Sequence, residues 1–88
     1  MKAFEEGDIL VGATLLNNPD DDHAGPGRII QFDSDLNLKG TLWTDNTTHL
    51  LGGLKFDSNK DLWAFDSQNC SAIKVNASGK QIDQADFG

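Results

Sequence analysis

The stretch that decides the fold is GLKFDSNKDLWA, residues 53–64. Two short runs of strand-forming residues flank a polar turn in it. Trp63 and Phe65 fall on one face of the second run because side chains alternate along a strand. Leu62 and Ala64 fall on the other face. A strand that is apolar on both faces belongs to a sheet that is covered on both faces, so we expect a hairpin in a sheet with a neighbour on each side.

The rest of the chain has the same β character. No stretch of about eleven residues or more keeps a helical period, and short apolar runs alternate with clusters of Gly, Asn, Asp and Ser. We therefore expect an all-β fold. The predicted strands are residues 7–15, 28–33, 38–44, 54–57, 61–66, 72–76 and 81–87.

The chain also repeats itself. Residues 1–10 align with residues 54–63 at an offset of 53, and residues 28–33 align with residues 71–76 at an offset of 43. The two offsets differ by ten residues because the first copy contains the polar loop at 16–26, which the second copy lacks. A repeat of about 40 to 50 residues with four strands in each unit is the period of β-propeller blades.

The repeat predicts two four-stranded antiparallel β-propeller blades. The first blade is expected over residues 1–48, with a long acidic loop at 16–26, and the second over residues 49–88. In the first blade, Met1 and Lys2 are expected to form a shortened inner strand.

The second copy resembles the blades of NHL-type propellers and of the gluconolactonase (senescence-marker) and streptogramin-lyase groups. Residues 53–64 show a Gly–apolar pair, then Asp57 at the end of the inner strand, a short turn, and an apolar and aromatic second strand. Residues 71–75 and the turn Ser78-Gly79-Lys80 resemble the third strand and the glycine turn after it. The resemblance covers nearly the whole chain and implies a propeller, but motifs of this kind encode a fold rather than an activity.

The resemblance also implies where an activity would be found. In the gluconolactonase-like enzymes, acid and amide side chains around the central channel hold a metal. This sequence departs from them, because Gly52 stands where an Asp often precedes the inner-strand Gly, and no Glu-x-Pro or Pro-Asn-Gly element is present. We therefore expect a non-enzymatic module that binds a small ligand or protein through its loops or central channel. The alternative is a metal-dependent hydrolase or lyase of the gluconolactonase or streptogramin-lyase type.

Composition limits the partners further. Fourteen Asp and Glu against seven Lys and Arg give a formal charge of −7, which repels nucleic acid and anionic lipid. No apolar run is long enough to cross a membrane, and the opening residues MKAFEE are not a signal peptide. The single cysteine, Cys70, excludes an intrachain disulfide.

Three residues of the long loop are candidates for a metal site, His49 is a candidate ligand-binding residue, and no catalytic residue is assigned. Asp20, Asp22 and His23 lie in the long loop, where carboxylates beside an imidazole can hold Ca²⁺ or Mg²⁺. A solvated acidic loop is the alternative. His49 lies four residues before Gly53, in the connection that would open toward the channel, and can act there as a general base or metal ligand. Capping a turn is the alternative for His49.

Trp43 is a candidate ligand-binding residue. Its ring can stack on a sugar or another flat ligand, and packing between sheets is the alternative.

Two blades alone leave an apolar face bare at each end, which favours a partner. One solution is a ring of identical chains, three for six blades or four for eight, of which we expect the homotrimer. The other is that the chain is a fragment of a longer propeller whose remaining blades cover both faces.

Overall fold

The computed structural model describes residues 1–14 and 25–87, and in these residues every regular element is a β-strand. The all-β prediction is confirmed, since a strand overlaps each of the seven predicted runs. The strands are β1 (Ile9–Thr14), β2 (Gly27–Phe32), β3 (Leu38–Trp43), β4 (Gly53–Phe56), β5 (Leu62–Asp66), β6 (Ser71–Val75) and β7 (Gln81–Asp86).

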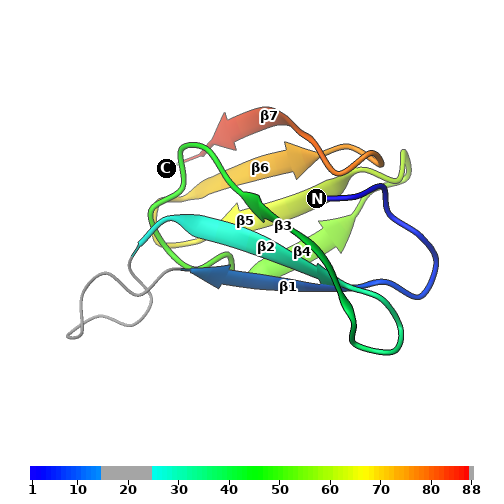
Figure 1. The fold of residues 1–88 in the computed structure, drawn as a ribbon. Helices are drawn as coiled ribbons and strands as arrows, with labels where there is room; N and C mark the ends of the chain where they lie inside the picture. Colours follow the sequence, from blue (N-terminus) through cyan, green and yellow to red (C-terminus); the bar gives the residue numbers. More distant parts are fainter. Residues whose placement is uncertain (15–24, 88) are drawn as a thin grey trace.

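The strands form two antiparallel sheets, one of β1-β2-β3 and one of β4-β5-β6-β7 (Figure 1). In each sheet every strand pairs with the strand next to it in sequence. The sheets pack face to face around one core, in which Ile29 of β2 meets side chains of β5 and β6. The buried members of this core are Ile29, Leu51, Leu62, Ala64, Ile73 and Val75.

The first sheet has three strands, so the prediction of an inner strand at Met1 and Lys2 is wrong. The backbone N–H of Lys2 donates to Oε1 of Gln31 at 2.9 Å. The backbone N–H of Phe4 donates to the carbonyl of Ala77 at 2.9 Å. These amides find partners on β2 and on the turn between β6 and β7, so the segment connects the two sheets instead of extending the first one.

Three of the hairpins share one turn, which begins with Asp33, Asp57 or Asn76. In each turn the side-chain oxygen of this first residue accepts the N–H groups of the residues two and four positions later, at 2.8–3.1 Å. An Asp or Asn side chain replaces backbone partners in this way and so favours a turn over a longer strand. The fourth residue is left-handed in all three turns, at Leu36 (φ 67°), Lys60 (φ 63°) and Gly79 (φ 83°).

The turns also match between the two aligned copies. Gly7 (φ 91°) aligns with Lys60 at the offset of 53, and Leu36 aligns with Gly79 at the offset of 43. Left-handed backbone is uncommon outside glycine, so its occurrence at both aligned pairs reflects a common local structure.

We expect the Ile73→Ala variant to lose about 2–5 kcal/mol of unfolding free energy, because it opens a cavity between the sheets. Ile73 is 1% exposed in β6, whereas Ile82 of the neighbouring β7 is 49% exposed. The matched Ile82→Ala variant should lose less than about 1 kcal/mol. Denaturant unfolding measures both values, and equal losses would contradict the position of Ile73 in the core.

Candidate functional site

The predicted metal ligands Asp20, Asp22 and His23 lie outside the described residues. Within residues 1–14 and 25–87, no three His, Cys, Asp or Glu side chains come close enough together to hold a metal ion. The prediction of a Ca²⁺ or Mg²⁺ site in the loop therefore stays a prediction.

His49 lies beside a buried carboxylate in the connection between β3 and β4. Its Nδ1 is 2.9 Å from the hydroxyl of Thr48. Asp66 is fully buried and accepts the backbone N–H of Thr48 at 3.1 Å and the side-chain amide of Asn69 at 2.9 Å. Burial acts to raise the pKa of Asp66, but these hydrogen bonds outweigh it and lower the pKa below the ordinary value. The charged carboxylate thus anchors the connection that carries His49.

Trp43 lies at the end of β3 and is 48% exposed. The guanidinium carbon of Arg28 is 5.1 Å from the centre of its indole ring, which is cation–π distance. The two residues are cross-strand partners in β2 and β3. Trp43 therefore belongs to the surface of the first sheet that points away from the core.

We call this surface the outer face of the first sheet. Its apolar residues form cross-strand pairs, Ile9 with Phe32 and Val11 with Ile30. Ile9 is 38% exposed and Val11 is 41% exposed. Exposure alternates along Ile9–Val11 of β1 and along β2, as expected when successive side chains point to opposite faces of a sheet. The apolar residues of the outer face are Ile9, Val11, Ile30, Phe32 and Trp43, and Arg28 lies on the same face beside Trp43.

The outer face has a buried counterpart in the second sheet. Val11 aligns with Ala64 at the offset of 53, and Ala64 is fully buried in the core. Ile30 aligns with Ile73 at the offset of 43, and Ile73 is also in the core. We call the side of each sheet that carries these aligned residues its front, and the opposite side its back. The back of the first sheet packs against the front of the second, so the two sheets are stacked in the same sense.

The far side of the second sheet is mixed in character. Trp63 lies there with the ammonium of Lys74 at 5.3 Å from its ring centre. Its indole N–H donates to Oδ2 of Asp57 at 3.0 Å. Phe65 and Ala72 are cross-strand partners on the same side. We call this side the far face of the second sheet.

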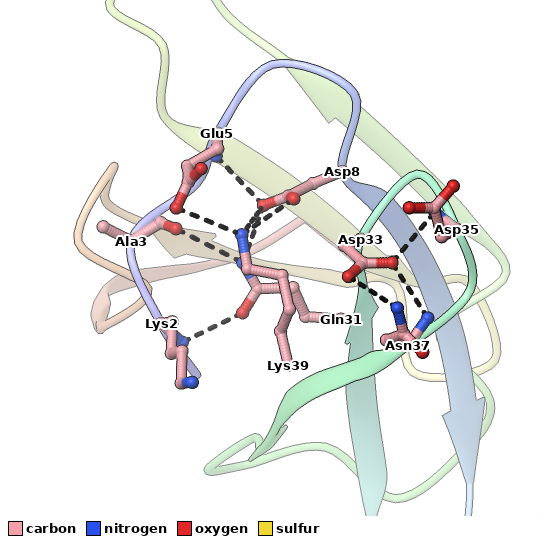
Figure 2. Close-up of polar contacts among 9 residues, drawn as sticks. All are labelled: Lys2, Ala3, Glu5, Asp8, Gln31, Asp33, Asp35, Asn37 and Lys39. Carbon is pink, nitrogen blue, oxygen red and sulfur yellow. Dashed lines mark hydrogen bonds and ion pairs between the residues drawn. The ribbon is translucent and has the colours of Figure 1, made fainter.

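A polar network fixes the N-terminal segment to the first sheet (Figure 2). Lys39 donates to both carboxylate oxygens of Asp8 at 2.8 Å. Gln31 is fully buried, and its amide donates to Asp8 at 2.9 Å. Hydrogen bonds from Lys39, from the backbone of Glu5 and from Gln31, of which the Lys39 bond has the largest effect, lower the pKa of Asp8 to about 2, and the bond to Asp8 raises the pKa of Lys39. None of these three residues was singled out from the sequence, because their partners are far apart along the chain.

No protein-family model, curated protein or solved structure matches this chain. Nor do the described residues include a helix of the length and hydropathy that a membrane crossing requires. Function is therefore inferred from the geometry of the chain itself.

We expect Asp8 to give the fold a measurable pH dependence. Its pKa falls from 3.8 to about 2 on folding, so its stabilisation is complete above about pH 5, shrinks as the pH falls through 3.8, and is lost below about pH 2. The difference in unfolding free energy between the wild type and Asp8→Asn should be constant above about pH 5 and shrink in more acid solution. Denaturant unfolding between pH 7 and pH 2 measures it.

The cause of this dependence can be tested at Lys39. A Lys39→Met variant should lose a substantial part of the acid dependence that Asp8 contributes, because the largest single cause of the shift is the Lys39 hydrogen bond. An unchanged acid dependence in Lys39→Met would contradict the assignment.

Proposed function

We propose that the chain is a non-enzymatic β-propeller module that assembles head to tail with copies of itself. Three chains would close a ring of six blades, and the loops or the central channel of the ring would bind a small ligand or protein. The observation that supports this most directly is the apolar outer face of the first sheet, whose aligned counterpart in the second sheet is buried against a neighbour.

The direction in which the two sheets stack favours a head-to-tail contact, between unlike faces of two copies, over a contact between two copies of the same face. Inside the chain, the back of the first sheet packs on the front of the second. The outer face is the front of the first sheet, and the far face is the back of the second. The described residues leave both surfaces uncovered, one at each end of the stack. If the far face of one copy covers the outer face of the next, both ends are satisfied by the geometry already used inside the chain. A two-fold dimer through the outer face would leave the far face bare.

The energetics favour a closed ring over an open pair. Covering the exposed part of a half-buried apolar side chain yields roughly 1 kcal/mol, so five such residues give about 5 kcal/mol. This gain lies at the low end of the roughly 4–15 kcal/mol that association costs. In a ring the last contact forms within an existing complex, at a high effective concentration. Closure therefore stabilises contacts that are weak one at a time.

The native mass of the purified chain tests the assembly. We expect one discrete species with three times the mass of a single chain, seen by light scattering and by native mass spectrometry. A monomer over the whole accessible concentration range would contradict self-assembly, and a discrete dimer would contradict the ring.

Charge placed on the outer face should abolish the assembly. Val11→Lys puts an ammonium on the proposed contact surface, where burying an unpaired charge costs several kcal/mol, so the trimer should fall apart into monomers. The control is Leu36→Lys, at a 66% exposed turn position off both faces. This control should stay trimeric, and a trimeric Val11→Lys would overturn the assigned contact.

Mixing two defective variants distinguishes a head-to-tail contact from a face-to-face one. Ala85 lies opposite Ala72 in β7, on the far face, and Ala85→Arg should block that side. Val11→Lys alone and Ala85→Arg alone should each be monomeric. Because a single open contact is weak, an equal mixture of the two should form a capped two-chain complex through the one intact pair of faces only at high protein concentration. If the outer face instead pairs with itself, Ala85→Arg will dimerise alone.

A further inference from the structure

A cavity of about 500 Å³ lies where the N-terminal segment meets the turn between β4 and β5. Phe4 and Phe56 line it, with their rings edge to face and their centres 5.4 Å apart. Phe56 is 47% exposed even though it belongs to a strand. Leu10 of β1 adds to the apolar wall. The cavity therefore offers aromatic surface to a ligand, at a volume typical of small-molecule sites.

The polar lining of this cavity is predominantly acidic. Four carboxylates line it against the single ammonium of Lys60. Asp8 forms an ion pair with Lys39, and the Nζ of Lys39 also lies 3.5 Å from Oε1 of Glu5. Glu6 has no hydrogen bond or ion pair among the described residues. The lining carboxylates are Glu5, Glu6, Asp8 and Asp57.

The walls of the cavity are held in place without a ligand. Phe4 is fixed by its backbone hydrogen bond to Ala77. Asp57 accepts the backbone N–H of Asn59 at 2.8 Å and the indole N–H of Trp63 at 3.0 Å. Glu5 is fixed through its N–H, which donates to the Asp8 carboxylate at 2.9 Å. Little ordering is needed on binding, which favours affinity for a small molecule.

We propose that this cavity binds a small organic cation, namely a primary ammonium group on an apolar stem. The stem would pack on Phe4 and Phe56, where an ammonium near an aromatic face is also attracted to the ring. The charged end would lie at the acidic rim, close to Glu6. The excess of carboxylates disfavours an anion, and a neutral ligand gains only from the apolar wall. One chain builds the whole cavity, so the proposal goes beyond ring assembly and does not depend on it.

Three probes of equal length but different charge test whether the cavity selects a cation. Hexylammonium, hexanol and hexanoate are titrated into the protein while the backbone amide signals of Gly7 and Lys60 are followed by NMR. We expect saturable shifts with hexylammonium, at least about tenfold weaker binding of hexanol, and none with hexanoate, with hexylammonium binding weakened by added salt. Equal binding of hexanol, preferred binding of hexanoate, or no saturation by hexylammonium would each overturn the proposal.

Variants locate the binding within the cavity. Phe56→Ala should weaken hexylammonium binding by about tenfold or more, and Glu6→Gln by a few fold. Glu6 is an exposed residue outside the strands, so its variant retains the fold. The matched aromatic control is Phe87→Ala, at a 63% exposed position that does not line the cavity, and it should bind as the wild type does. Unchanged affinity in both cavity variants would place the binding elsewhere and sink the assignment.

A further comparison identifies the source of the ammonium group. A blocked Ala-Lys-Ala peptide is titrated beside its Ala-Gln-Ala analogue. Binding of the lysine peptide alone would extend the site to lysine side chains of proteins. Binding of hexylammonium without the lysine peptide would restrict the site to free amines, and both results support a cation site.

Discussion

The contact between the two sheets is the constraint on which the rest of the structure depends. Neither sheet can cover its own apolar face, and Ile29 of the first sheet is buried only because the second lies against it. The contact between the sheets also requires a glycine at position 12. A Cβ atom at Gly12 would lie 1.9 Å from the carbonyl oxygen of Leu51, so any other residue would push the connection between the sheets away. Leu51 itself is 2% exposed and completes the core.

The same contact explains why the molecule has two unlike ends. Each sheet carries apolar residues on both sides, and one side of each is used inside the chain. Because the sheets stack in the same sense, the surfaces left over are a front and a back rather than two copies of one face. The outer face of the first sheet is rich in aliphatic residues, whereas the far face of the second carries Trp63 with Lys74 and Asp57 around it. This asymmetry suits a directional contact.

The N-terminal segment is the place where sequence reasoning failed, and the reason is chemical. Alignment of the two copies puts Met1 and Lys2 where β4 lies in the second sheet. Pairing along β1 would use backbone partners only. Gln31 instead offers a buried amide that accepts from Lys2 and donates to Ala3 and Asp8 (Figure 2). A buried amide left unsatisfied costs about 1–3 kcal/mol, so the route of the segment follows the side chain rather than the repeat.

The sequence alone determined the positions of the seven strands and the turns between several of them, because side-chain alternation and the Asp33, Asp57 and Asn76 turns act over a few residues. It also indicated that both faces of the sheets need covering. Only the tertiary structure decided which face of each sheet lies inside, the path of the N-terminal segment, and the cavity beside Phe56. Alternation makes two faces different but does not say which one meets a neighbour. That choice is made by contacts between residues tens of positions apart, such as Lys39 with Asp8, which no local pattern encodes.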